Sequence, residues 1–378
     1  MKKILLPILL MVIAHLTYAQ WERKSKLGFS GGYESNVFLN PPSLVVDGIT
    51  MGRDQLLESG TFQRVYLNNT FVLDTLNHRL KIKANVGASI YQTEIKANRH
   101  TYDIGVSYRK KVGRKKYFEI APEYNRRQRD GVNETDAVIR TPFSFRQVLI
   151  PFHFDYYLGK RAWLKTQVGY LFKDYDRVEG EELYYRSPFV TAAISKKWLG
   201  SEATKKLTVT ANGQWRKYTD IEAITSNAED PEFVSEERNW NYIRLNTEFE
   251  VIDSENKYRL LFGLYHLRRV DVDGPNGYIQ FSPRIQFKYK LKKLTLESEF
   301  KYSLRNYLEL SPGAENETLL KYNYIRAGLG GSYDLKRNMY VFLKGRIVNR
   351  ESNSPNLSAI GFRDYFTGFA EVGMVVKF

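Results

Sequence analysis

Apolar and polar side chains alternate along most of this chain with a period of two residues. Within residues 79–92, Leu80 and Ile82 fall on one face, whereas Lys81 and Lys83 fall on the other. A helix would distribute the same lysines around its surface, so this alternation indicates a β-strand. The segment is predicted to be a strand with one apolar face and one polar face.

The same period returns along the whole chain and predicts about sixteen strands. They lie near residues 79–92, 102–108, 118–124, 148–156, 164–172, 207–215, 243–251, 279–289, 294–302 and 339–347, and more weakly near 27–38, 61–74, 184–195, 257–270, 319–333 and 363–378. An even number is the rule for single-chain bacterial barrels. Pro122 and Pro283 fall inside two of these strands, and we expect a β-bulge at each of them.

The polar face of these strands favours a membrane barrel over a soluble β-sandwich. A sandwich needs a dry interior of Leu, Ile and Val, but the minor face here repeatedly carries Arg, Lys, Asn, Gln and Glu. Strands that cross lipid must close into a barrel, because every backbone N–H and C=O needs a partner within the protein. We therefore predict an all-β fold, a closed antiparallel transmembrane β-barrel of about 16 strands with short periplasmic turns and longer acidic extracellular loops.

Aromatic residues make up 14% of the chain, with 27 Tyr and 22 Phe, which suits the interfacial aromatic bands of such a barrel. The chain contains no cysteine, which excludes N-terminal lipid acylation and disulfide bonds. Stability is therefore expected to come from backbone pairing and burial.

The start of the chain is typical of a secretory signal peptide. Lys2 and Lys3 precede the apolar run from Ile4 to Ile13, and small residues follow up to Ala19. The alternative is an uncleaved anchor, but the run is shorter than the roughly 18 to 20 residues that a spanning helix needs. We predict a Sec-type signal peptide over residues 1–19 and one barrel domain over residues 20–378.

The chain ends in an amphipathic strand that closes with an aromatic residue, Phe378. This end resembles the last strand of Gram-negative outer-membrane β-barrels, in which the assembly machinery reads the strand and pairs it with the first. The resemblance implies an outer-membrane location, the assembly machinery as a partner and Phe378 as the assembly signal.

Charge is distributed unevenly along the chain. The formal charge of +15 falls to +13 without Lys2 and Lys3, and basic residues gather in the turns near 109–116 and 290–293. Acidic residues gather in the loops 176–184 and 220–236. Basic turns suit anionic lipid headgroups, and we favour this interpretation over an anionic solute or an acidic protein at that mouth. The acidic loops are expected to share divalent cations with lipopolysaccharide. No nucleic-acid recognition motif is present, so no nucleic-acid partner is predicted.

If the apolar faces meet lipid, the polar faces line an enclosed lumen. The predicted pore-lining residues are Arg64, Lys83, Lys165, Arg216, Arg244, Arg284, Lys301, Arg305, Arg326, Arg346, Glu123, Glu248 and Glu299. Arginines opposite carboxylates can hold a transverse field across a channel, or they can form ion pairs that only neutralise the wall. For any single residue the second explanation is the simpler one, because every barrel wall carries polar residues.

A barrel of about sixteen strands leaves an aqueous channel unless a segment plugs it. The chain offers no folded cork before its first strand and no periplasmic repeats, which argues against a TonB-dependent transporter and an Omp85-type insertase. Loop 39–60 is the first candidate for a constriction, through Pro41, Pro42, Leu44 and Val46, and loop 221–236 is the second.

Catalytic and metal-binding patterns are missing from the sequence. The five histidines include His15 of the signal peptide, and none of the others has a serine or aspartate at a telling spacing. There is no cysteine, no paired histidine and no calcium-loop pattern. We predict no enzyme activity, no cofactor and no metal.

Residues 31–38, Gly-Gly-Tyr-Glu-Ser-Asn-Val-Phe, look like the "GYDSNVF" first strand of many outer-membrane barrels, including the barrel part of surface lipoprotein assembly modifiers. Those modifiers carry a helical-repeat domain before the barrel, and this chain has none, so their export activity is not implied. The sequence predicts a porin-like channel for passive diffusion of small polar or anionic solutes. The alternative is a non-enzymatic subunit or scaffold of an outer-membrane assembly or export complex with protein partners.

Overall fold

The computed structural model describes residues 21–46, 49–92, 97–129, 144–176, 183–219, 239–272, 274–311, 318–353 and 364–378. The predicted signal peptide and the loop 221–236 lie outside these ranges. The main sheet consists of β1 (Glu22–Glu34), β4 (Gly60–Asp74), β5 (His78–Tyr91), β6 (Arg99–Gly113), β7 (Lys116–Ile120), β8 (Glu123–Arg129), β9 (Phe145–Gly159), β10 (Ala162–Tyr175), β11 (Leu183–Leu199), β12 (Ala203–Thr219), β13 (Asn239–Asp253), β14 (Tyr258–Asp271), β15 (Tyr278–Leu291), β16 (Leu294–Tyr307), β17 (Lys321–Lys336), β18 (Met339–Ser352) and β19 (Tyr365–Lys377). A separate hairpin consists of β2 (Leu44–Val46) and β3 (Ile49–Met51), and it is followed by the one-turn helix α2 (Arg53–Leu56).

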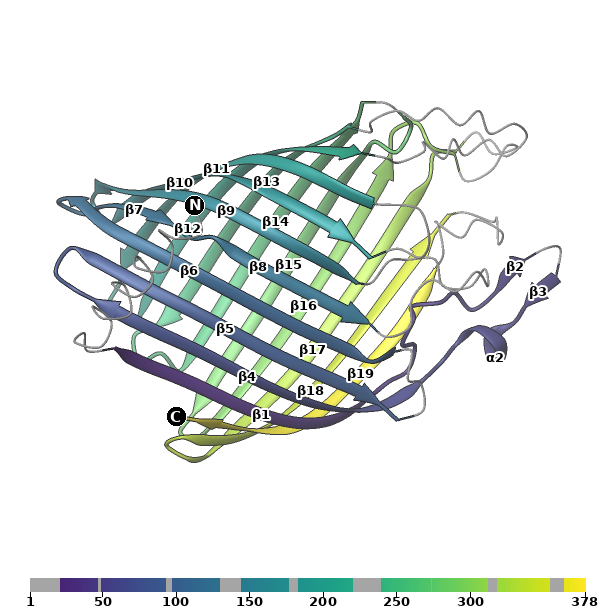
Figure 1. Ribbon diagram of the computed structural model, residues 1–378, viewed down its shortest axis with the longest axis horizontal. Helices are drawn as coiled ribbons and strands as arrows, with labels where there is room; N and C mark the ends of the chain where they lie inside the picture. Colours follow the sequence, from purple (N-terminus) through teal and green to yellow (C-terminus); the bar gives the residue numbers. More distant parts are fainter. Residues whose placement is uncertain are drawn as a thin grey trace, which may run out of the picture.

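The sheet closes on itself because β1 pairs with both β4 and β19. The seam between the first and last strands is antiparallel, with Lys26 opposite Lys377 and Glu34 opposite Phe369. Figure 1 shows the tilted strands wrapping into a cylinder with the C-terminus at one end. The predicted closed antiparallel barrel is confirmed.

β7 and β8 occupy one position in the wall, since both pair with β6 and both pair with β9. The wall therefore has sixteen strand positions. Pro122 separates β7 from β8, yet the register against both neighbours is unchanged across it, and its carbonyl oxygen still accepts a 3.0 Å hydrogen bond from Val106. Pro283 stays opposite Leu264 on β14, and although the ladder with β16 skips Ser282 and Pro283, its register is the same on both sides of that gap. The two predicted bulges are wrong, because proline removes one donor but leaves its carbonyl paired.

Connections between the strands are alternately short and long. The short ones run over residues 75–77, 114–115, 160–161, 200–202, 254–257, 292–293 and 337–338, and we call their side of the barrel the short-turn end. The remaining connections, apart from residues 121–122 between β7 and β8, lie on the opposite side, which we call the long-loop end. No helix within the described ranges is long and apolar enough to cross a membrane.

The two faces of the wall differ in chemistry. The outer face exposes large apolar side chains, including Ile104, Ile243 and Leu343, at 54%, 61% and 62% of their surface. Soluble monomers rarely show such a continuous apolar surface, so this face is built for lipid. The inner face is identified by a contact between Arg129 and Val37, because their strands are separated by β4, β5 and β6 and can meet only on the concave side.

The first strand ends at Glu34, four residues before the end of the predicted segment 27–38. The chain then turns into the barrel mouth, where Val37 and Phe38 are buried against inward-facing rings such as Phe62. Asn36 fixes this turn, since its side-chain amide donates a 2.8 Å hydrogen bond to the carbonyl oxygen of Asn40. Alternation alone could not reveal the change of direction, because both strand and turn bury apolar residues here.

Candidate functional site: the lumen wall

The residues predicted to line a pore share the inward face of the wall. Side-chain alternation and the cross-strand register place on this face Arg64, Lys83, Lys165, Arg216, Arg244, Arg284, Lys301, Arg305, Arg326, Arg346, Glu123, Glu248 and Glu299. Their role in conducting a solute stays a prediction.

Some of these residues are neutralised by a neighbour. Arg284 donates a 2.7 Å hydrogen bond to Glu248, and Arg64 lies 3.2 Å from Glu371 beside the seam. The Glu299 carboxylate accepts a 3.0 Å hydrogen bond from Gln286. The two ion pairs follow the simpler interpretation, in which charges on the wall satisfy one another, whereas Gln286 is a neutral partner of Glu299.

Other inward cations are placed against one another. Arg284, Lys301 and Arg326 are directly opposite on the adjacent strands β15, β16 and β17. Like charges in directly opposite positions repel and destabilise a sheet. Only Arg284 has a carboxylate partner among the described residues, and Arg346 follows on β18, opposite Gly328. This part of the wall therefore carries an excess of positive charge.

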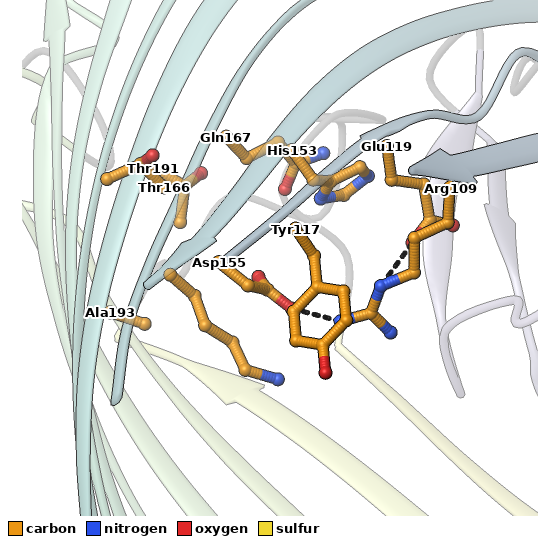
Figure 2. A pocket seen from close by; sticks show the side chains of 10 residues that line it. Arg109, Tyr117, Glu119, His153, Asp155, Thr166, Gln167, Thr191 and Ala193 are labelled. Atoms are coloured by element: carbon orange, nitrogen blue, oxygen red, sulfur yellow. Dashed lines mark hydrogen bonds and ion pairs between the residues drawn. The ribbon is translucent and has the colours of Figure 1, made fainter. Parts of the chain in front are cut away.

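A recess of about 350 Å³ opens on the inner wall toward the short-turn end (Figure 2). The Arg109 guanidinium donates a 2.9 Å hydrogen bond to Asp155 and lies 4.2 Å from the ring centre of Tyr117. Glu119 and Lys165 also line the recess, so its two carboxylates balance its two cations. The recess can hold a polar solute but favours neither sign of charge.

A second recess lies beside the first and contains two of the predicted residues, Lys83 and Glu123. His153 lines both recesses, opposite Glu119 in the register. Within the described ranges, no group of three or more His, Cys, Asp or Glu side chains is arranged to hold a metal ion.

Toward the long-loop end, cations and aromatic rings alternate over ten neighbouring strand positions of the inner wall. We call this set the girdle, and it consists of Phe145, Lys173, Tyr185, Arg216, Tyr242, Arg269, Tyr278, Arg305, Tyr324 and Arg350, one from each strand from β9 to β18. Strands that run toward the short-turn end supply the rings, and strands that run toward the long-loop end supply the cations.

Cation–π contacts link most neighbours of the girdle. The Lys173 ammonium lies 3.7 Å from the ring centre of Phe145, and the Arg216 guanidinium lies 4.2 Å from Tyr185 and 4.8 Å from Tyr242. Such contacts are worth on the order of 0.5 to 2 kcal/mol each, and more when they are desolvated.

The chain of contacts continues along the later strands. The guanidinium groups of Arg269 and Arg305 both lie 4.3 Å from the ring centre of Tyr278. Those of Arg305 and Arg350 lie 5.2 and 5.7 Å from the ring centre of Tyr324. Where no such contact is present, between Lys173 and Tyr185 and between Tyr242 and Arg269, the two residues are directly opposite in the register.

Four of the five girdle cations are compensated by rings and not by carboxylates. Among the described residues, Lys173, Arg216, Arg269 and Arg305 form no ion pair. Arg216 donates a 2.9 Å hydrogen bond to the Tyr218 hydroxyl, a neutral partner. The girdle is therefore a rigid positive arc.

Sequence reasoning found only Arg216 and Arg305 of this arc and missed its rings. A signal was present in the sequence, because three strands carry, at or near their ends, a cation followed two residues later by a tyrosine: Lys173 and Tyr175, Arg216 and Tyr218, and Arg305 and Tyr307. Such a pattern recurs when strands that run in the same direction place the same residue types on their inner face at the same depth. The predicted residue Arg244 lies 4.8 Å from the ring centre of Tyr242, beside the girdle.

Apolar side chains enter the mouth at the long-loop end from two connections. Val37 and Phe38 pack on one side, and Leu310 and Leu320, from the connection after β16, pack against inward tyrosines that include Tyr322. These four residues were not among the predicted constriction residues.

The predicted constriction residues lie on the connection after β1. Pro41 is buried and Pro42 is exposed, while Leu44 and Val46 belong to the hairpin strand β2, which stands beyond the end of the wall in Figure 1. A constriction formed by this hairpin stays a prediction.

The terminal residue completes the seam at the short-turn end. The amide of Phe378 donates a 2.9 Å hydrogen bond to the Ser25 carbonyl, and its own carbonyl accepts one of 3.2 Å from Ser25. Its side chain is 66% exposed, which leaves the ring accessible.

Comparison with known proteins identifies the fold and nothing finer. No family model matches the chain, and no curated protein matches it. Among solved structures, OccAB1 of Acinetobacter baumannii superimposes with a TM-score of 0.52 at 10% identity, over 94% of this chain and 96% of that one. OccAB3 of the same organism gives 0.47 at 10% identity, over 94% and 100%. A loop L8 deletion mutant of OmpT, an outer membrane protein of Vibrio cholerae, gives 0.46 at 10% identity, over 95% and 99%. The chain thus has the fold of outer-membrane β-barrels.

Proposed function

We propose that this barrel is a porin-like, non-enzymatic channel in the outer membrane of a Gram-negative bacterium, through which small polar or anionic solutes diffuse. The observation that carries the proposal is the charged inner wall of a cylinder of sixteen strand positions. A wall of this size encloses water unless a segment fills it, and small barrels alone are filled by their own side chains.

The sign of the wall charge supports anions over cations. Lys301, Arg326, Arg216, Arg269 and Arg305 form no ion pair among the described residues, whereas the acidic wall residues Glu248 and Glu371 are already paired. Rings of Arg and Lys are a recurring device for anion-selective pores. The short turns would then face the periplasm, and the long loops would face the exterior and lipopolysaccharide.

Conductance of the purified protein in a planar bilayer tests this function directly. We expect discrete conductance steps and a reversal potential, under a salt gradient, of the sign for anion preference. Replacement of Arg326 and Arg346 by Gln is expected to shift that potential toward zero. A protein that inserts and gives no steps, or that prefers cations, rules out the proposed channel.

The second candidate is a scaffold barrel in an assembly or export complex, and the short resemblance of residues 31–38 to assembly-modifier barrels favours it. The end of that motif packs inside the mouth through Val37 and Phe38, so the resemblance has a structural explanation that needs no partner. Purification from native membranes separates the candidates, because a scaffold brings stoichiometric protein partners and a channel does not. Export by the Sec route and assembly through Phe378 belong to both candidates.

A further inference from the structure

Arg216, Arg269 and Arg305 are held by neighbours that occupy only some of their N–H groups, and Arg269 uses two of its nitrogens for the carbonyl oxygen of Asn276. Arg216 is fixed by the rings of Tyr185 and Tyr242, and Arg305 donates hydrogen bonds of 3.0 and 2.9 Å to the Gln280 side chain. Stacking occupies the flat faces of a guanidinium and leaves N–H groups at its edge. A donor that is already immobilised loses less entropy when it binds.

The spacing of the cations limits the size of the ligand. They lie on every second strand, which separates them by about 10 Å across the sheet, given a strand spacing of about 4.8 Å. Lys173 and Arg350 are eight strands apart, so the arc extends over about 40 Å of wall. A small anion would contact one cation at a time, whereas a chain with repeated charges would contact several.

The charges around the girdle distinguish it from the rest of the lumen. The recess near the short-turn end is balanced by Glu119 and Asp155, and Arg284 is held by Glu248. Arg326 and Arg346 lie on β17 and β18, nearer the short-turn end than the girdle residues of those strands, and extend the positive surface inward. A solute entering from the long-loop end would therefore meet the girdle, beside Leu310 and Leu320, before it reached Arg326 and Arg346.

We propose that the girdle binds an acidic oligosaccharide, a chain with repeated carboxylate or sulfate groups, at the mouth of the barrel. Ring-stacked guanidinium groups bind the charged groups of successive sugar units along the arc. The inference deepens the proposed function, on which its meaning for transport rests, because it names the class of anion that the channel would admit.

Calorimetric titration of the detergent-solubilised full-length barrel tests the proposal, with hexagalacturonate and monomeric galacturonate as probes. We expect the hexamer to bind about 100-fold more tightly than the monomer, because linked groups engage several cations together. The triple variant Arg216→Gln/Arg269→Gln/Arg305→Gln is expected to lose about tenfold in affinity for each arginine removed, since charge-assisted hydrogen bonds are of that size.

A matched control removes the same charge from inward lysines outside the girdle, in the triple variant Lys83→Gln/Lys165→Gln/Lys344→Gln. This control is expected to keep its affinity for the hexamer within about twofold, because charges beyond a Debye length of about 8 to 10 Å are screened. Equal loss in both triple variants would show a general charge effect and would overturn the girdle as the site. If the girdle variant does not fold, Arg269→Gln alone is expected to lose about tenfold, and unchanged affinity there is equally decisive against the proposal.

The remaining outcomes separate this inference from the proposed channel. Equal affinity for monomer and hexamer would show a single-anion site and overturn the chain-like ligand, as would the absence of hexamer binding. Binding by a barrel that conducts no ions would support the girdle while ruling out the channel. Conductance steps without any binding of the hexamer would support the channel while ruling out the girdle as a binding site.

Discussion

The Arg129 guanidinium, at the end of β8, donates a 2.9 Å hydrogen bond to the carbonyl oxygen of Val37, just after the end of β1. The same guanidinium lies 5.1 Å from the ring centre of Phe38. Two parts of the barrel that are separated by three strands are therefore tied together inside the mouth, and the turn after β1 is part of the wall's support.

Removing this tie should loosen the turn. Arg129→Met keeps the approximate length of the side chain but loses its hydrogen-bond donors. We therefore expect faster hydrogen exchange of the Val37 backbone amide, which donates a 2.8 Å hydrogen bond to the backbone carbonyl of Glu58. Protection should fall because the turn opens more often without that partner. Arg146→Met, an exposed arginine paired with Asp174 on β10, is the control and should leave this amide unchanged. Equal protection in the Arg129 variant would show that the tie adds no stability.

Glu34 anchors the end of the first strand from inside. Its carboxylate accepts a 2.6 Å hydrogen bond from the Tyr91 hydroxyl and lies 3.1 Å from the Arg99 guanidinium. The Glu34 side chain is 6% exposed and that of Arg99 is 20% exposed. Glu34→Gln is expected to lower the free energy of unfolding by about 2 kcal/mol, because the half-buried Arg99 loses its charged partner. Urea titration in detergent micelles measures it. Glu22→Gln breaks an exposed ion pair with Lys24 and should cost less than about 1 kcal/mol. Equal losses of stability in the Glu22 and Glu34 variants would contradict the role of Glu34 as a buried anchor.

Two adjacent glycines of the seam should respond very differently to a methyl group. A Cβ on Gly32 would lie 2.2 Å from the carbonyl oxygen of Ala370, whereas the nearest atom to a Cβ on Gly31 is 3.7 Å away. Gly32→Ala is expected to destabilise the barrel by about 1 to 3 kcal/mol, because the backbone of β19 has to shift. Gly31→Ala should fold with an almost unchanged urea midpoint. Similar yields of folded, heat-modifiable barrel from both variants would argue against the close approach at the seam.

A charge reversal at Arg326 should improve stability and weaken anion preference together. Arg326 is directly opposite Lys301, so Arg326→Glu replaces a repulsive cross-strand pair with an attractive one. We expect a gain of about 0.2 to 1 kcal/mol in the free energy of unfolding and a reversal potential shifted toward cations. Arg326→Gln should fall between the two in both measurements. A loss of stability in the Glu variant would mean that a carboxylate outside this pair already compensates Arg326.

Phe378→Ala should separate folding from assembly. Both backbone hydrogen bonds between residue 378 and Ser25 remain in the variant, and the lost ring is exposed. Refolding into detergent is therefore expected to proceed at nearly the wild-type yield, while the amount in the outer membrane of cells falls several-fold. Equal amounts of the two proteins in cells would remove the role of the terminal ring as an assembly signal.

The architecture could be predicted from the chain because a barrel wall is a strictly periodic object. Alternation fixes which side chains of a strand face lipid, as for Ile82, and the seam between β1 and β19 follows from closure. Pro122 and Pro283 misled the prediction, because the loss of one backbone donor was expected to shift the register. A ladder held by its other bonds tolerates that loss.

The candidate site was harder to predict, because its residues meet across strands. Arg269 and Tyr278 are neighbours by register, which depends on the stagger of the whole barrel and not on their separation in sequence. The turn after Glu34 was also missed, because burial inside the mouth and burial against a neighbouring strand produce the same apolar pattern. Most of the wall's chemistry was visible residue by residue, but the girdle was visible only once the strands were aligned.

Each β-hairpin from β9 to β18 contributes one ring and one cation to the girdle, in that order. Duplication or loss of a hairpin would therefore lengthen or shorten the positive arc by one complete unit without interrupting its alternation. A wider or narrower cylinder could evolve in this way while its entrance kept the same local chemistry, so the diameter and the charge pattern of the opening are inherited together.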